Sequence, residues 1–281
     1  MDRSMISAAV TMNQLQKGLD VVANNLSNLS TNGYKSRSAS FSELLYQNLT
    51  NQPDQDQNLG RLTPIGLRMG SGARLSDTQM DTSMGALKQT DRALDVALLK
   101  PDQFFQVSVR DDNGGYHTRY TRDGAFYLQP EANNPNKMNI VTASGAFVLG
   151  RNGQPLQIPS DTESITINQT GHIQATLRDG RNIQVGDIGV VAMKRPQLLQ
   201  ALGDNMLGFP DLSPLGLNLN DVVTPAGATE TAVRQGMLEG SNVDLSREMT
   251  NMMMMERAYQ FNAKAISVAD DMQGLVNGLR P

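Results

Sequence analysis

The sequence predicts an α+β fold, in which a mostly β body lies between two long terminal helices. Three observations predict it. Apolar residues repeat in heptads over roughly the first 30 of the 281 residues. Roughly the last 40 residues can gather apolar side chains on one helical face. Between about residues 91 and 237, runs of strand composition recur about every 8–12 residues, with turn-forming residues between them.

The first helix is predicted over residues 1–30. Its apolar residues fall at alternating steps of three and four and make an unbroken heptad seam: Met5, Ala8, Met12, Leu15, Leu19, Val22, Leu26 and Leu29. We expect the helix to stop near Ser30–Gly33, because Asn and Gly suit a left-handed C-cap. Isolated helices are marginal in water, so the two ends of the chain are expected to cover each other as a discontinuous coiled-coil core of residues 1–45 and 238–281.

An extended connector is predicted over residues 46–90. The polar run at residues 51–58 contains Pro53 and breaks any helix. Residues 65–75 are rich in glycine but lack the Gly-Lys-Ser/Thr ending of a P-loop. Extended strands are therefore expected here, with glycines where two backbones approach closely.

A compact all-β outer domain is predicted over residues 91–237. Its strands are expected at residues 94–98, 104–109, 116–120, 138–142, 147–149, 154–158, 165–168, 172–177 and 183–192. Residues 198–203 are predicted to be a short helix, and residues 205–225 to be irregular. The segment 231–240 is expected to return and pair with the connector near residues 80–89.

The second long helix is predicted from Ser241 to Leu279, with Ser241 and Asn242 as candidate N-caps. One face can collect Leu245, Met249, Met252, Met255, Tyr259, Ala263, Ile266, Ala269 and Val276. The consecutive methionines Met252 to Met255 fill a helical turn, and such flexible side chains suit burial on several sides. Two interpretations stay open, an ordinary core helix or a helix packed among copies of itself.

Composition excludes several classes of function. The net charge of −4 argues against a nucleic-acid surface, and the absence of cysteine excludes disulfides and thiol chemistry. No apolar run is long enough for a transmembrane helix, and the N-terminus lacks the apolar core of a signal peptide. His117 and His172 have no partners at metal-ligand spacing and are expected to be surface or cross-strand residues. We therefore expect no enzyme activity, no metal and no cofactor.

Two signatures at opposite ends carry a family resemblance. The segment Val21–Lys35, with Asn24-Asn25 and Asn32-Gly33-Tyr34, resembles the N-terminal signature of the bacterial flagellar rod and hook proteins. The segment Gly240–Leu245, followed by Glu248-Met249 and Glu256–Tyr259, resembles the C-terminal signature of that family. Tyr120–Phe126 resembles a motif of its β domain. The similarity covers nearly the whole chain and is greatest to the distal rod subunit.

The resemblance implies a structural axial subunit of the flagellar basal body. Identical subunits would polymerise into a helical rod that transmits torque from motor to hook and encloses the export channel. Partners would be further copies, other rod and hook subunits, and the flagellar type III export apparatus. The protein would be extracytoplasmic and exported without a cleaved signal peptide.

The resemblance also implies site residues. Phe41 and Leu45 fit a short export-recognition pattern. The expected polymer interface comprises Met5, Met12, Leu15, Leu19, Val22, Asn24, Asn25, Leu26, Leu29, Gly33, Tyr34, Met249, Met252, Met255, Tyr259 and Ile266. Within the family, a proximal rod or hook subunit is the alternative. From another class, a secreted adhesin or carbohydrate-binding β module on a coiled-coil stalk stays open, although aromatic residues are only 5% of the chain and include no Trp.

Overall fold

The computed structural model describes residues 3–43, 46–49, 67–70, 72–111, 114–131, 134–227 and 230–278. The chain divides into two compact units. The helical unit contains Met1–Ser27, Arg37–Gln79 and Asp244–Pro281, and the β unit contains Asn28–Ser36 and Met80–Val243. A long C-terminal helix and a mostly β body confirm the predicted mixture of α and β structure. The predicted polar run at residues 51–58 and Leu45 lie outside the described residues.

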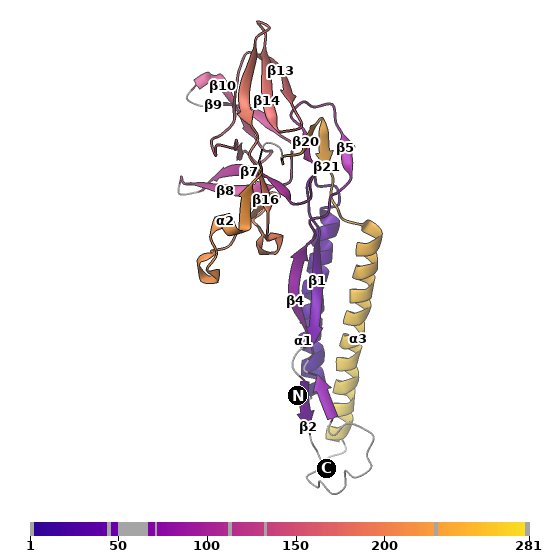
Figure 1. Ribbon diagram of the computed structural model, residues 1–281. Coiled ribbons are helices and arrows are strands. Elements are labelled where there is room, and N and C mark those ends of the chain that lie inside the picture. Colours follow the sequence, from indigo (N-terminus) through magenta and orange to yellow (C-terminus); the bar gives the residue numbers. More distant parts are fainter. Residues whose placement is uncertain are drawn as a thin grey trace. The chain divides into compact units, whose positions relative to one another are not determined.

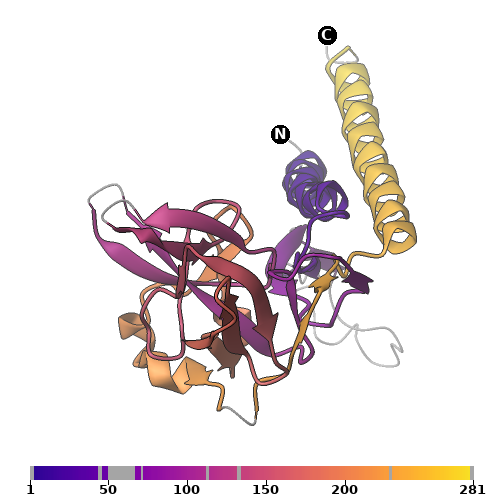
Figure 2. The ribbon, with the colours of Figure 1, turned by 90° about the horizontal axis from the view of Figure 1, so that it is seen from above.

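The helical unit is built on two antiparallel helices that lie side by side. Helix α1 spans Arg3–Ser27 and helix α3 spans Leu245–Gly278, and both views show them as neighbours (Figure 1, Figure 2). Strand β1 (Arg37–Glu43) pairs with β4 (Ala73–Met80), and β1 packs along α1. A second pair consists of β2 (Tyr46–Leu49) and β3 (Leu67–Gly70). Strands β2, β3 and β4 lie in the extended connector predicted over residues 46–90, whereas β1 lies in residues 1–45, which were assigned to the helical core. Together the four strands form two short antiparallel ribbons.

Helix α1 ends earlier than its heptad pattern predicted. It stops at Ser27 rather than near residues 30–33, which leaves Leu29 exposed beyond the helix. The buried side chain of Asn25 explains the early end. Its Nδ2 donates to the Arg37 carbonyl at 2.7 Å, and its Oδ1 accepts from the Arg37 amide at 2.9 Å. Because these two hydrogen bonds bring Arg37 back beside α1, the intervening residues form a loop instead of another helical turn.

Helix α3 begins later than predicted, and Asp244 caps it. The Oδ1 atom of Asp244 accepts from the amides of Ser246 (2.9 Å) and Arg247 (3.3 Å). A carboxylate here satisfies free N–H groups and faces the positive end of the helix dipole. Ser241 and Asn242, the predicted caps, precede the helix, so that prediction was wrong by two to three residues.

In its described residues, the β unit contains a ten-stranded sheet, a three-stranded sheet and two strand pairs. The large sheet runs β12-β10-β11-β7-β8-β18-β17, with β9, β16 and β19 attached beside this path. Its strands are β7 (Gln103–Arg110), β8 (Tyr116–Thr121), β9 (Tyr127–Glu131), β10 (Asn134–Val141), β11 (Phe147–Val148), β12 (Gln157–Pro159), β16 (Val190–Met193), β17 (Gln200–Ala201), β18 (Met206–Gly208) and β19 (Val223–Pro225).

The smaller sheet and the strand pairs complete this unit. The smaller sheet comprises β13 (Thr162–Ile167), β14 (His172–Leu177) and β15 (Asn182–Asp187). Strand β20 (Val233–Gln235) pairs with β6 (Val96–Leu98), and β21 (Met237–Glu239) pairs with β5 (Leu87–Gln89). The last pairing confirms the predicted return of residues 231–240 to the segment near residues 80–89.

Two local predictions in this unit were wrong. The single strand expected at residues 183–192 is divided into β15 and β16, because Gly189 donates to the Leu149 carbonyl and accepts from the Gln106 amide. The helix expected at residues 198–203 is instead a 3-10 turn at Pro196–Leu198 followed by strand β17. The expected irregular region contains a second 3-10 turn at Ser213–Leu215 and the short helix α2 at Leu219–Val222.

The core of the β unit consists of buried apolar clusters. The larger of two buried apolar clusters contains Phe105 and Phe126, whose rings meet edge to face with centroids 5.2 Å apart. The smaller cluster centres on Phe104, Val191 and Val222. Burying large aromatic side chains supplies much of the stabilisation of a domain, so this unit has the core of an independent domain.

Candidate assembly interface

Most of the predicted interface residues lie on α1 and α3, the two neighbouring helices. On α1, Val22 and Asn25 are buried, and the partly buried members are Met5, Met12, Leu15, Leu19 and Leu26. On α3, Met252, Met255, Tyr259 and Ile266 are partly buried. Asn24 and Met249 are exposed in the single subunit. On α3, the partly buried residues form an inner row with a spacing of three and four. Glu248, Asn262 and Ala269 are also at least partly buried and continue that row.

Gly18, which no sequence motif marks, permits close packing in this unit. A Cβ atom on Gly18 would lie 2.7 Å from the Phe41 ring and 3.1 Å from the sulfur of Met255. Helix α1, strand β1 and helix α3 therefore meet at Gly18. Phe41, which was predicted for export recognition, packs here with its ring partly exposed.

The opposite side of α3 carries a second apolar row. Met254, Phe261, Val268 and Leu275 follow one another at intervals of seven residues, and each is between 48% and 74% exposed. Residues seven apart lie on nearly the same side of a helix, so these four form one stripe, named here the outer stripe. Contiguous apolar surface on a helix marks an interaction site.

The signature loop, residues Asn28–Ser36, belongs to the β unit and contains a buried cation. The Nζ atom of Lys35 lies 2.8 Å from Oε1 of Glu239, and the Nε atom of Arg122 lies 2.6 Å from Oε2 of the same carboxylate. All three side chains are at most 2% exposed. Lys35 also donates to the Ser83 carbonyl, and Arg122 donates to the Lys100 carbonyl. One carboxylate thus joins two cations in a cluster named here the charge clamp.

Backbone contacts reinforce the charge clamp. Gly33 has φ 68° and donates its amide to the Glu239 carbonyl at 2.7 Å. Asn242 accepts from the Ser36 amide at 2.7 Å and donates to the Asp81 carbonyl at 2.9 Å. The Tyr34 carbonyl accepts from the Asn242 amide at 3.4 Å. The segment that follows α1 and the segment that precedes α3 are consequently fixed to one another within the β unit.

A strained turn at Asn205 also holds the signature loop. Asn205 has φ 57°, a left-handed conformation that is unusual for a residue other than glycine. Its Nδ2 donates to the Asn32 carbonyl at 2.6 Å, and its own carbonyl accepts from the Thr121 hydroxyl at 3.0 Å. Left-handed strain of this kind persists only where the surrounding contacts determine it. The contact to Asn32 is one of them.

The charge clamp shifts the pKa values of two of its members. Burial raises the pKa of the Glu239 carboxyl, but hydrogen bonds and charges from Arg122 and Lys35 outweigh burial and leave this pKa below its ordinary value. Burial, together with the Arg122 charge, lowers the pKa of the Lys35 ammonium despite its contact with Glu239. The site therefore favours an ionised Glu239 and penalises the charge on Lys35.

A pH titration should detect the Glu239 shift. A carboxyl group whose pKa is lower in the folded state stabilises the fold above its ordinary pKa of about 4.3, and this contribution is lost as the pH falls through the folded-state value. We expect the stability difference between wild type and Glu239→Gln to be largest at neutral pH and to shrink as the pH falls below about 4. Urea titrations at several pH values measure it, and a difference that is constant with pH would contradict the assignment.

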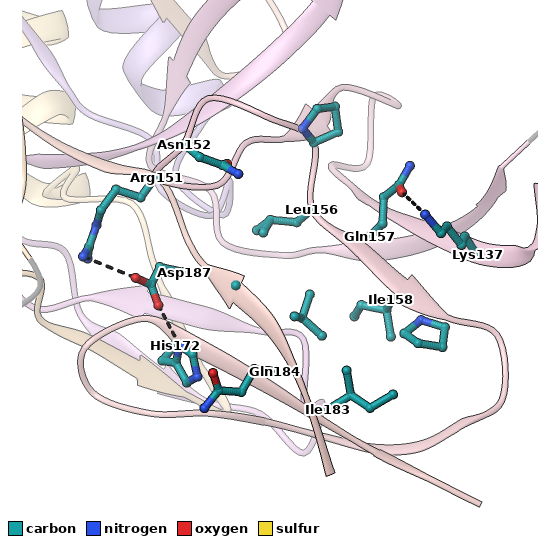
Figure 3. Close-up of a pocket in the computed structure, with 14 residues that line it drawn as sticks. Lys137, Arg151, Asn152, Leu156, Gln157, Ile158, His172, Ile183, Gln184 and Asp187 are labelled. Atoms are coloured by element: carbon teal, nitrogen blue, oxygen red, sulfur yellow. Dashed lines mark hydrogen bonds and ion pairs between the residues drawn. The ribbon is translucent and has the colours of Figure 1, made fainter. Parts of the chain in front are cut away.

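A hollow in the β unit contains one of the two histidines. It has a volume of about 720 Å³ and lies between β12 and the β14–β15 hairpin. Asp187 bonds Nδ1 of His172 at 2.6 Å and lies 3.3 Å from Nη1 of Arg151 (Figure 3). His172 faces Asp187 across the β14–β15 ladder, which confirms its predicted cross-strand position. His117 on β8 is exposed and lies 3.6 Å from Asp111.

Among the described residues, no helix is long and apolar enough to cross a membrane.

Three family models match this chain. Residues 5–35 match the flagella basal body rod protein, residues 99–175 the D1 domain of the flagellar hook protein FlgE/F/G, and residues 234–279 the C-terminal part of the flagellar basal body rod FlgEFG proteins. FlhP of Bacillus subtilis, a flagellar hook-basal body complex protein, is 38% identical over 280 residues and 99% of each chain. The chain belongs to the flagellar basal-body rod and hook protein family.

Two further relatives in this family are flagellar basal-body rod proteins named FlgG. The proteins from Agrobacterium fabrum and Bacillus subtilis are each 32% identical over 276 residues, which is 98% of both chains. This agreement confirms the resemblance to the flagellar rod and hook proteins that the two terminal signatures indicated, and the names of the relatives make it FlgG-like and FlhP-like.

The charge clamp takes one residue from each matched segment of this rod and hook protein. Lys35 lies in the N-terminal match, Arg122 in the D1 match and Glu239 in the C-terminal match. The three parts of the chain that define the family therefore meet in one buried cluster. Lys35 and Arg122 lie in the motifs Val21–Lys35 and Tyr120–Phe126, but no local signal in the sequence shows that they share Glu239.

Proposed function

We propose that this protein is a non-enzymatic structural subunit that assembles with copies of itself into the flagellar rod, in the basal body and outside the cytoplasm. Membership of the family and the relatives named flagellar basal-body rod proteins support the rod. The distal position is proposed from the resemblance of the sequence signatures to the distal rod subunit. Further rod and hook subunits would lie at its ends, and the type III export apparatus would deliver it. No cofactor is needed, because the proposed role is mechanical.

The outer stripe of α3 is the observation that carries this proposal. Phe261 is 74% exposed and lies in line with Met254, Val268 and Leu275. An exposed apolar side chain gains roughly 1.5–3 kcal/mol when it is fully buried, so covering four of them favours association strongly. In a helical polymer every subunit uses the same two unlike surfaces, and the stripe would be one of them.

The proposed assembly also assigns roles to the two units. The predicted division into a discontinuous core (1–45 and 238–281), a connector (46–90) and an outer domain (91–237) would place the helices at the centre of the rod. The charge clamp would fix the segments adjoining both helices. The rod could then transmit torque through packed helices and enclose a channel for exported subunits.

A charged side chain in the outer stripe should block assembly without unfolding the subunit. We expect Phe261→Glu to be exported normally but to build no rod, since burying an unpaired carboxylate at an interface costs far more than exposing it. A strain lacking the native gene, complemented with each variant, is scored for swimming and for the subunit in isolated basal bodies. Gln260→Glu is the matched control, because Gln260 is an exposed neighbour outside the stripe.

Comparing the two variants shows whether an effect on assembly comes from the added charge itself or from its position in the outer stripe. Gln260→Glu should restore swimming, whereas Phe261→Glu should not. Swimming and normal incorporation with Phe261→Glu would overturn the outer stripe as an interface. Normal swimming of the deletion strain itself would overturn the axial function and favour the alternative of an adhesin or carbohydrate-binding module. In the deletion strain, the part of the flagellum at which assembly stops would distinguish a distal rod subunit from a proximal rod or hook subunit.

A further inference from the structure

The methionines of α3 fall into two groups with different exposure. Met249, Met253, Met254 and Met272 are between 45% and 58% exposed. Met252 and Met255 are partly buried on the row that faces α1, and the sulfur of Met255 lies against Gly18. In the β unit, Met193 is 5% and Met206 8% exposed. The run of four methionines therefore places two thioethers toward α1 and two toward solvent.

We propose that Met249, Met253, Met254 and Met272 form an oxidation site whose sulfoxidation prevents association of the subunit. This inference rests on the proposed function: Met254 lies in the outer stripe and Met272 on the same side of the helix, whereas Met249 and Met253 are exposed on the same helix outside it. The modifying agent is a peroxide of the hydrogen peroxide class. The four residues are named here the exposed methionines.

The chemistry of the step requires only access to sulfur. A lone pair of the thioether sulfur attacks one oxygen of the peroxide, the O–O bond breaks, and the product is a sulfoxide and one molecule of water. The sulfur loses two electrons and the peroxide gains them, so no further reactant is needed. The exposed methionines offer this access, whereas packing restricts it at Met252 and Met255 and closes it at Met193 and Met206.

Sulfoxidation changes the character of the surface. It replaces an apolar, flexible side chain by a polar one, and such a change disrupts methionine-rich interfaces. Met254 belongs to the outer stripe, and Met272 lies 18 residues, or five full turns, after it on the same side of the helix. A sulfoxide buried there needs a hydrogen-bond donor that an apolar contact does not offer.

The experiment follows oxidation and association of the purified full chain. Increasing hydrogen peroxide is followed by peptide mass spectrometry to locate each added oxygen, and by sedimentation velocity to measure association. We expect the exposed methionines to react before Met252, Met255, Met193 and Met206. Once they have reacted, the association constant should fall by at least about tenfold, and treatment with sulfoxide reductases for both epimers should restore it.

Two variants locate the effect, each compared with its own untreated sample. Met249→Leu/Met253→Leu/Met254→Leu/Met272→Leu should show no fall in association after peroxide. The matched control Met252→Leu/Met255→Leu should show the same fall as wild type. Random oxidation, or a fall that persists in the fourfold leucine variant, would overturn the inference.

The controls also separate this inference from the proposed function. Untreated wild type that stays monomeric would contradict self-assembly, and the inference would fall with it. Untreated wild type that associates, with association unchanged after complete oxidation of the exposed methionines, would contradict the inference alone.

Discussion

Glu239→Gln is expected to destabilise the β unit by about 3–5 kcal/mol, the range for breaking a buried ion pair from one side. The carboxylate is 1% exposed and neutralises two buried cations, Lys35 and Arg122. Without its charge, two positive groups remain close together in a medium where their repulsion is weakly screened. Within the described residues, the Nη2 atom of Arg122 is already buried without a hydrogen-bond partner. Weakening the contact with Glu239 would therefore leave the guanidinium still less satisfied.

A half-exposed carboxylate in the same unit provides the control. Asp187 also contacts two basic groups, Arg151 and His172, but its side chain is 33% exposed. Exposed ion pairs contribute about 0–1 kcal/mol, so Asp187→Asn should lower stability by less than about 1 kcal/mol. Urea titrations at pH 7, followed by circular dichroism, measure both variants, and similar losses would contradict the assigned importance of burial.

A double-mutant cycle tests whether the clamp acts as a unit. Lys35→Met removes a favourable pair in wild type, but in Glu239→Gln it removes a cation that no longer has its counter-charge. We therefore expect the cost of Lys35→Met to be smaller in Glu239→Gln, with a coupling of at least about 1 kcal/mol. Additive losses would mean that the two residues act independently.

Local patterns predicted the elements of this protein well, because periodicity and turn chemistry act over a few residues. The heptad seam predicted α1, and the strand-like runs predicted most strands of the β unit. The start of α3 shows the limit. Ser241, Asn242 and Asp244 are all good N-caps by type, and the chain uses Asp244 because Asn242 bridges Ser36 and Asp81. Tertiary bonding decided between equivalent local choices.

The candidate site was less predictable because its parts are distant in sequence. Lys35 and Glu239 are 204 residues apart, and Arg122 and Glu239 are 117 apart. Nothing local marks one carboxylate as the partner of two such cations. The outer stripe, by contrast, was visible as the seven-residue spacing of Met254, Phe261, Val268 and Leu275. The apolar face predicted for α3 did not include these residues, and their exposure in the structure separates them from the row that faces α1.

Gly33→Ala is expected to lower the stability of the β unit by about 2–5 kcal/mol. The φ angle of 68° costs an L-residue roughly 1–2 kcal/mol, since Cβ approaches the following carbonyl. The added Cβ would also lie 2.5 Å from the carbonyl carbon of Arg122 and 2.6 Å from the amide nitrogen of Asp123. These are backbone atoms that move only with β8 and its flanking turn, and forced overpacking adds about 1–3 kcal/mol.

Gly180→Ala separates the two causes. Gly180 has φ 83°, but a Cβ atom there meets nothing within 4 Å. Gly180→Ala should therefore lose only the stability that the left-handed backbone conformation costs an alanine, about 1–2 kcal/mol. The difference between the two variants in urea midpoint, at equal slope, measures the close approach of the signature loop to Arg122. Equal losses would show that the loop yields without strain. A larger loss at Gly33 would mean that this glycine is required because the loop lies directly on the backbone that presents Arg122 to the charge clamp.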